Sequence, residues 1–229
     1  MSESTASVTR GDLKRHVLRF WGASRTLGNI TSENATDLAD IIAGAERQFY
    51  SPPNGHQWSF LAGVLSISIT NGTATYDLPD DYAGMLDQEL ALSTTASWAI
   101  KVKPLKLVLE QTQTYGTSMP SGISKPLMVA EKPKTFTAST GQRWQAQFWP
   151  TPTGSAAVTG RYRVLPNVMS DDTYYPMGGQ PHAQTLIEAC LSLAEQMMND
   201  EAGVHTQRFN ELMAASVAMD LRLHQQEAA

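Results

Sequence analysis

Carboxylates are the residues of this sequence whose types and spacing could do chemistry. The stretch ITNGTATYDLPDDY holds Asp77, Asp80 and Asp81, and two neighbouring carboxylates can serve as a general acid and a general base. A second adjacent pair, Asp171 and Asp172, lies farther along the chain. Each pair follows a proline, where turns and helix caps use aspartate to satisfy backbone N–H groups. The sequence therefore favours a structural role for both pairs.

The other reactive residue types are scattered along the chain. Asp200, Glu201 and His205 form the one local cluster that could bind a metal, but residues i and i+5 of a helix point apart. Cys190 lies in the apolar run LIEACLSLA, which predicts a buried, inert thiol. The sequence has no Gly-rich phosphate loop, no GxSxG motif and no HExxH motif. We therefore expect a protein that is not an enzyme and has neither a cofactor nor a metal.

The composition is typical of a globular protein. Of its 229 residues, 41% are hydrophobic and 17% are charged, and the net charge is −5. Residues 1–26 nevertheless carry a local net charge of +3, which could contact nucleic acid but is better explained as a solvated helix face. The N-terminal segment is too charged for a signal peptide, and no apolar run reaches the length of a membrane span. We therefore expect no membrane partner.

Apolar residues at helical spacing predict helices near both ends of the chain. Residues 9–26 are expected to form one helix, with Thr9 as its candidate N-cap. Residues 33–50 are expected to form a second helix, with Thr31 or Ser32 as its N-cap, and the two would make a helical hairpin. Further helices are expected over residues 105–115, from Pro181 onward, and from Val204 to Leu223, with a break at Gly203. The helix after Pro181 is expected to bury a wide apolar face: Leu186, Ile187, Cys190, Leu191, Ala194, Met197 and Met198.

The middle of the chain has the period of two that is typical of strands. Leu65, Ile67 and Ile69 alternate with polar residues, and Asn71-Gly72 follows, which is the strongest local signal for a β-hairpin. A two-residue turn there predicts three cross-strand pairs on one buried face: Ile69 with Ala74, Ile67 with Tyr76, and Leu65 with Leu78. Residues 126–165 predict further strands, with Trp144 and Tyr162 facing inward.

These elements predict an α+β fold in three sequence segments. Residues 1–57 form an N-terminal helical part, residues 58–166 a β-rich antiparallel domain with one short helix, and residues 167–229 the C-terminal helices and tail. The C-terminal helices are expected to pack with the N-terminal ones, so that the helical parts form one domain.

Large apolar side chains in loops indicate where a partner could bind. Tyr174, Tyr175 and Met177 lie in a loop rich in turn residues, and Trp149 precedes Pro150 and is expected to be exposed. Aromatic side chains can also stack on sugars. A β-rich tail or baseplate module that recognises carbohydrate or another tail protein is therefore the alternative interpretation.

Four stretches carry a resemblance to a known family. They are YDLPDDY at residues 76–82, KPLMVAE at 125–131, AQFWPTPTGSAAVTGRYRVLPNVMSDD at 146–172, and the helical run over 184–222. In this order and spacing, the chain resembles the head-to-tail adaptor (connector) proteins of tailed bacteriophages, including the tail tubular protein A group.

The resemblance implies a structural virion protein that is made in the cytoplasm of the host bacterium. Such adaptors form rings, typically dodecamers, under the portal protein, extend the DNA channel and dock a tail or nozzle protein. Genomic DNA would pass through without sequence-specific binding, and the acidic net charge is expected to suit that passage. The C-terminal segment would reach the portal, so Leu221 and Leu223 are candidate contacts. Removal of residues 217–229 is expected to leave a folded monomer that no longer joins the portal.

Overall fold

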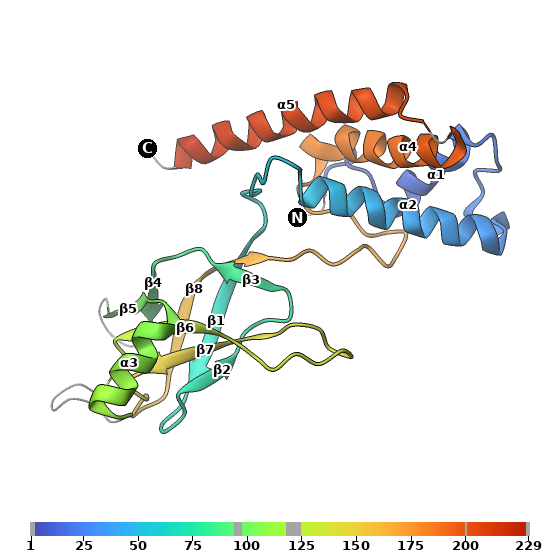
Figure 1. The fold of residues 1–229 in the computed structure, drawn as a ribbon. Helices are drawn as coiled ribbons and strands as arrows, with labels where there is room; N and C mark the ends of the chain where they lie inside the picture. The colour runs from blue at the N-terminus through green and yellow to red at the C-terminus, as the bar shows by residue number, and fades with distance from the viewer. Residues whose placement is uncertain (1–2, 94–97, 118–124, 200, 228–229) are drawn as a thin grey trace. The chain divides into compact units, whose positions relative to one another are not determined.

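The computed structural model describes residues 3–93, 98–117, 125–199 and 201–227 (Figure 1). The chain folds into two compact units. One comprises Met1–Leu61 together with Pro166–Ala229 and is called the helical unit, and the other comprises Ala62–Leu165 and is called the β unit. The predicted α+β fold class is confirmed.

The helical unit contains four α-helices and two short 3₁₀ turns among its described residues. Their bounds are α1 Arg10–Phe20, η1 Leu27–Asn29, α2 Ser32–Tyr50, η2 Gln180–His182, α4 Ala183–Asn199 and α5 Val204–Glu227. Within the described residues, no helix is both long enough and apolar enough to cross a membrane.

Both predicted N-caps of the first two helices are confirmed. Thr9 accepts a hydrogen bond from Asp12 N, and Asp12 accepts one from Thr9 N, which completes a capping box. Thr31 accepts from Asn34 N at the start of α2. The predicted C-terminus of the first helix at residue 26 is wrong. The helix ends at Phe20, because Gly22 turns the backbone out with a φ of +68°.

Helix α4 is the centre of the helical unit. It packs against α1, α2 and α5, and residues of all four helices share one apolar core, in which Cys190 is fully buried. The predicted burial of Cys190 is confirmed, and burial raises the pKa of its thiol, which disfavours the reactive thiolate. The predicted apolar face of α4 is too long, however. Met197 and Met198 lie in its last turn with more than half of their surface exposed.

The β unit is built on one sheet. Its strands are β1 Ala62–Ile69, β2 Thr75–Asp77, β3 Tyr82–Met85, β4 Glu89–Leu92, β5 Trp98–Val102, β6 Met128–Pro133, β7 Trp144–Trp149 and β8 Ala156–Val164. The strand order is β1-β8-β4-β5-β6-β7-β2, with β3 also paired to β8. The two ends of this order, β1 and β2, are joined by a turn of the chain, so the sheet curls into a nearly closed barrel (Figure 1).

One strand pair departs from the predicted antiparallel sheet. Strands β5 and β6 are parallel, and the connection between them contains helix α3, Leu105–Tyr115, at the predicted residues. A parallel pair needs a crossover of this kind, because its second strand must start from the same end as the first. Val108 of α3 packs against Ala130 and Trp149 in a small core of its own.

The predicted hairpin between β1 and β2 is wrong, although the turn between them forms. Strand β1 pairs along its whole length with β8, and β2 pairs with β7. The phenol of Tyr76 accepts a hydrogen bond from Thr70 N and donates to Thr73 O, so it occupies backbone groups beside the turn. The alternation still placed Leu65, Ile67 and Ile69 correctly, because all three are buried.

Candidate functional site

The carboxylates of the β unit are held in structural contacts. Asp77 accepts hydrogen bonds from Gln145 and Lys134, which keep its pKa below the ordinary value. Asp80 forms an ion pair with Arg143, with 3.0 Å between Oδ1 and Nε. Asp81 accepts a hydrogen bond from the phenol of Tyr162. Each of the three carboxylates is engaged by a neighbouring side chain, which supports the structural interpretation of these aspartates.

The second aspartate pair anchors a loop to the start of α1. Asp172 Oδ1 lies 2.8 Å from Arg10 Nη1 and 2.7 Å from Lys14 Nζ. Burial raises the pKa of Asp172, but the two cations outweigh this effect and hold it below the ordinary value. Asp171 accepts hydrogen bonds from Thr173 N and Oγ1 and so closes a turn. Both carboxylates therefore fix the backbone of this loop.

The anchored loop presents the predicted partner contacts Tyr174, Tyr175 and Met177. Tyr174 O accepts from Arg10 N, and Met177 N donates to the phenol oxygen of Tyr50 at 2.9 Å. The three side chains remain 54%, 46% and 38% exposed. The predicted exposure of these side chains is therefore confirmed, and the hydrogen bonds fix the backbone that carries them.

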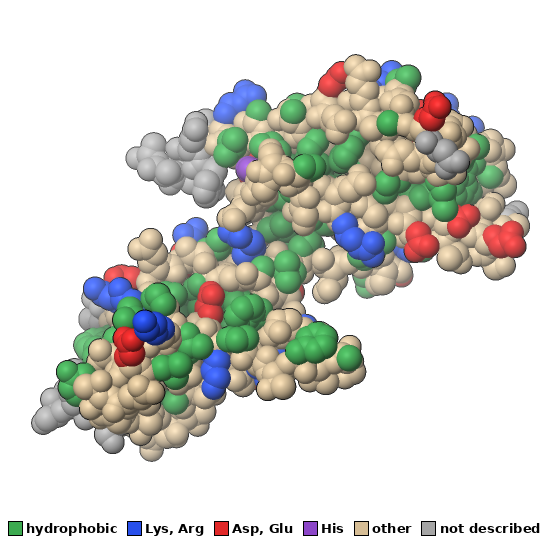
Figure 2. Space-filling view, in the orientation of Figure 1, with side chains coloured by type: hydrophobic (Ala, Val, Ile, Leu, Met, Phe, Trp, Pro, Cys, Tyr) green, Lys and Arg blue, Asp and Glu red, His purple; other side chains and the backbone are tan. Residues whose placement is uncertain are grey.

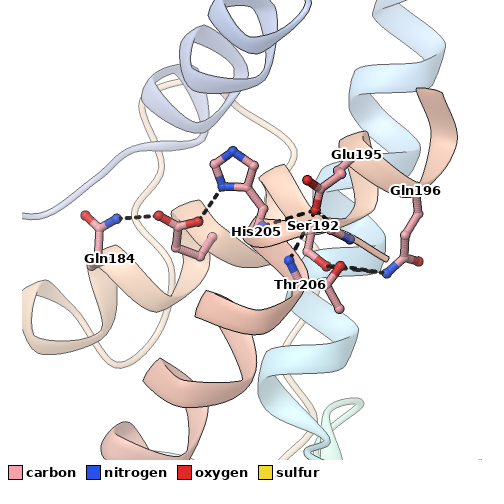
Figure 3. Close-up of polar contacts among 8 residues, drawn as sticks. Gln184, Ser192, Glu195, Gln196, His205 and Thr206 are labelled. Carbon is pink, nitrogen blue, oxygen red and sulfur yellow. Dashed lines mark hydrogen bonds and ion pairs between the residues drawn. The ribbon is translucent and has the colours of Figure 1, made fainter. Parts of the chain in front are cut away.

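The α4–α5 seam is a second feature of the helical unit, and it is polar (Figure 3). Three buried polar side chains of α4, Glu188, Ser192 and Glu195, face the first turns of α5. His205 Nδ1 lies 2.7 Å from Glu188 Oε2, and the hydroxyls of Ser192 and Thr206 lie 2.9 Å apart. Gln184 and Gln196 add hydrogen bonds to this network.

Glu195 caps α5 from a neighbouring helix. Its Oε2 accepts hydrogen bonds from the backbone N–H groups of Gly203, His205 and Thr206, at 3.2, 3.1 and 3.3 Å. The first N–H groups of a helix have no partner within it, and they carry partial positive charge that favours a carboxylate. A Cβ at Gly203 would lie 2.2 Å from Glu195 Oε1, so glycine leaves room for this cap.

His205, part of the local cluster that the sequence disfavoured as a metal site, contacts Glu188. Asp200 lies outside the described residues. Among the residues that the structure does describe, no group of three or more His, Cys, Asp or Glu side chains could hold a metal ion.

Asp220 is the last anchor of α5 among the side chains that the structure describes. This carboxylate is 3% exposed and accepts hydrogen bonds from Ser59 N and Oγ, and its Oδ2 lies 2.8 Å from His56 Nε2. Burial raises the pKa of Asp220, but the hydrogen bonds from Ser59 and the contact with His56 outweigh burial and lower it. Between this anchor and the N-terminal cap, the apolar contacts of α5 with the core come from Phe209, Met213 and Val217.

The position of Asp220 corrects the predicted C-terminal truncation. Removal of residues 217–229 would take away Val217, which is buried in the core, and Asp220. Such a chain would lose part of its fold together with any docking segment. Beyond Asp220, Leu221 is 47% exposed, as a partner contact requires. The candidate contact Leu223 belongs to the helix, but its side chain lies outside the described ones.

The expected exposure of Trp149 is wrong. Its side chain is 5% exposed and packs against Val108 and Ala130, and its indole N–H donates to Gly116 O at 3.0 Å. Helix α3 covers this face of the sheet, which the alternation of side chains along the strand had predicted to be exposed to solvent. Trp149 therefore has little surface to offer a sugar or a protein partner, which removes the main support for a carbohydrate-binding module.

Sequence reasoning missed the α4–α5 seam. The available signal was the spacing of Glu188, Ser192 and Glu195, which lie at i, i+4 and i+7 within the apolar run of α4. That spacing places all three on one face of the helix. A polar stripe in a central helix indicates a polar partner helix, and α5 supplies one through His205 and Thr206.

The helical unit therefore exposes large apolar side chains on an anchored loop and continues α5 beyond Asp220. The family model described as SU10 adaptor protein matches residues 8–228, across both units. The chain therefore belongs to the SU10 adaptor protein family of phage head–tail adaptors, and it is a structural virion component. No curated protein matched the sequence.

Proposed function

We propose that this adaptor forms a ring of identical copies, with a dodecamer expected, under the portal protein of the phage head. The ring extends the DNA channel and docks a tail or nozzle protein, in the manner of the tail tubular protein A group that the sequence resembles. The observation that carries the proposal is the family match, which spans residues 8–228 and so includes both units.

The helical unit provides the portal contacts in this proposal. Tyr174, Tyr175 and Met177 supply exposed apolar area on a fixed backbone. The C-terminal end of α5, from Leu221 onward, supplies a helical segment that follows the last anchor of the unit. Interface centres are rich in aromatic side chains and methionine, so these residues match a protein partner.

Passage of DNA sets a requirement on charge. The β unit carries nine Lys and Arg and seven Asp and Glu, a net charge of +2, so the remaining −7 belongs to the helical unit. DNA that must slide through a channel needs a lining that does not hold its phosphates tightly. A net charge near zero or below in each unit meets this requirement, and binding without sequence specificity is expected.

Electron microscopy of adaptor-free phage heads that have been mixed with the purified chain tests the proposal. We expect a ring of added density at the portal vertex, seen with the full chain.

A chain that ends at Arg222 keeps Asp220 and the core, so we expect it to fold and yet to give less density at the portal. Tyr174→Ala with Tyr175→Ala should have the same effect, whereas Tyr115→Ala, an exposed tyrosine of the β unit, serves as the matched control. Density at another site of the particle, or none with the full chain, would refute the proposed function.

A further inference from the structure

A basic groove lies along α1. It has a volume of about 410 Å³ and is lined by Thr5, Ser7, Val8, Asp12, Arg15, His16, Arg19 and Arg25. Asp12, Arg15, His16 and Arg19 follow the spacing i, i+3, i+4 and i+7, which places them on one face of α1. The groove therefore brings the guanidinium groups of Arg15 and Arg19 together on one face of α1, and Arg25 from the next loop adds a third.

The single carboxylate of this groove is already engaged. Asp12 accepts hydrogen bonds from the backbone and side chain of Thr9, and its other oxygen pairs with Arg15 at 2.7 Å. Among the residues that the structure describes, no carboxylate lies within ion-pair distance of Arg19 or Arg25, and both side chains are exposed. The groove therefore presents two guanidinium groups that an incoming anion can bind.

An acidic stripe lies on α2 of the same unit. Glu33, Asp37 and Asp40 follow the spacing i, i+4 and i+7, and acidic side chains gather along the N-terminal half of α2 in Figure 2. No described Lys, Arg or His forms an ion pair with any of the three. The two exposed methionines of α4, Met197 and Met198, line a groove of about 370 Å³ together with Asp37. Methionine is enriched at protein interfaces, and polar side chains such as these carboxylates belong to the interface rim.

The two surfaces match in charge and in length. Each row covers seven residue steps of α-helix, which is about 10 Å. Among the described residues no ion pair joins the two rows within one copy, which leaves them free to pair between copies. Head-to-tail repetition of a contact between two different patches is heterologous, and it forms a ring when the rotation between copies closes. Like patches would repel each other, so the charge pattern disfavours a two-fold dimer through either row.

From this match we infer that the α1 groove of one copy binds the acidic stripe of α2 from the neighbouring copy. The inference rests on the proposed ring and identifies one of its contacts. The groove could also attract DNA phosphates, but Asp12 lies within it and the helical unit carries a net charge of −7, both of which disfavour a polyanion. A short acidic helix face with apolar neighbours fits the groove better.

Paired charge reversals test this contact. Arg19→Glu and Asp37→Arg are each expected to weaken assembly of the ring on adaptor-free heads by roughly tenfold or more, because each places like charges opposite one another. The double variant Arg19→Glu with Asp37→Arg restores an opposite pair across the interface, and assembly should recover. Arg208→Glu, an exposed arginine of α5, makes the same charge change outside both rows and is the matched control. Circular dichroism spectra should be the same for all variants, and Arg19→Gln with Asp37→Asn provides a milder pair should a reversal unfold the chain.

The outcomes separate this contact from the ring itself. Rings that form normally with either single reversal would overturn the contact and leave the proposed function standing. The contact would also be overturned if the double variant assembled as poorly as the two single variants. Normal rings combined with altered retention of packaged DNA would assign the groove to DNA instead. Absence of rings with the unmodified chain would refute the proposed function.

Discussion

Glu46 provides a test of the energetics of the helical unit. This glutamate of α2 is 1% exposed, and its Oε2 accepts a hydrogen bond from Met169 N at 3.2 Å, while Oε1 has no hydrogen-bond partner. Burial raises the pKa of Glu46 to about 7, against an ordinary value of 4.5, although the hydrogen bond from Met169 and the charges of Arg10 and Arg47 oppose the shift. The folded chain therefore holds a proton on Glu46 that the unfolded chain releases.

The direction of the pH effect follows from this difference. The group's folded pKa is above its unfolded value, so its full contribution to stability is present below pH 4.5 and is lost as the pH rises through about 7. A pKa difference of one corresponds to about 1.4 kcal/mol. Relative to low pH, where Glu46 is protonated in both states, the raised pKa lowers the free energy of unfolding by roughly 3 kcal/mol at pH 8 and about 1 kcal/mol at pH 5. Replacement by a neutral side chain of the same shape removes this cost.

Glu46→Gln is therefore expected to raise the free energy of unfolding, by about 2 kcal/mol more at pH 8 than at pH 5. Urea unfolding at both pH values, followed by circular dichroism at a helix-sensitive wavelength, measures the difference between the variant and the unmodified chain. Glu33→Gln, an exposed glutamate at the start of the same helix, gives the baseline for removing one surface carboxylate. An equal stability difference at the two pH values would refute the reasoning, as would a variant that is less stable at pH 8.

Two further predictions concern single buried side chains. Asp220→Ala leaves the N–H and hydroxyl of Ser59 and the imidazole of His56 without their acceptor, and we expect a loss of about 2–4 kcal/mol in urea unfolding. An Asp220→Ala variant as stable as the unmodified chain would show that α5 is not anchored there. Trp149→Ala opens a cavity against Val108 and Ala130 and should cost about 3–5 kcal/mol, with assembly on phage heads unchanged below the melting temperature. If the Trp149→Ala variant folds but fails to assemble, Trp149 would instead be a contact with a partner protein.

Local sequence signals predicted the helices well. Thr9 and Thr31 mark the true starts of α1 and α2, because capping depends only on residues within one turn. The bounds of α3 also follow from local spacing. The alternation in β1 correctly predicted which side chains are buried, since the period of a strand fixes its two faces.

Pairing between distant segments could not be predicted in the same way. The Asn71-Gly72 turn is a local signal, but β1 gained a longer partner in β8, some ninety residues farther along the chain. Trp149 was placed on the exposed face because the covering of that face by α3 depends on a parallel crossover. The candidate contacts in the loop before α4 were predicted as exposed, whereas their fixed backbone depends on Asp172 and α1.

The α4–α5 seam also affects how the free chain behaves in solution. Most amphipathic helices bury an apolar face against the core. When such a helix detaches, the exposed apolar surface makes the rest of the chain prone to aggregation. Lifting the first turns of α5 would instead bring Glu188, Ser192 and Glu195 into contact with water, which hydrates them well. Phe209 is the first side chain of α5 that lies in the apolar core, and Met213 and Val217 follow in later turns. Opening of α5 from its N-terminal end would therefore expose polar side chains before it exposes the core.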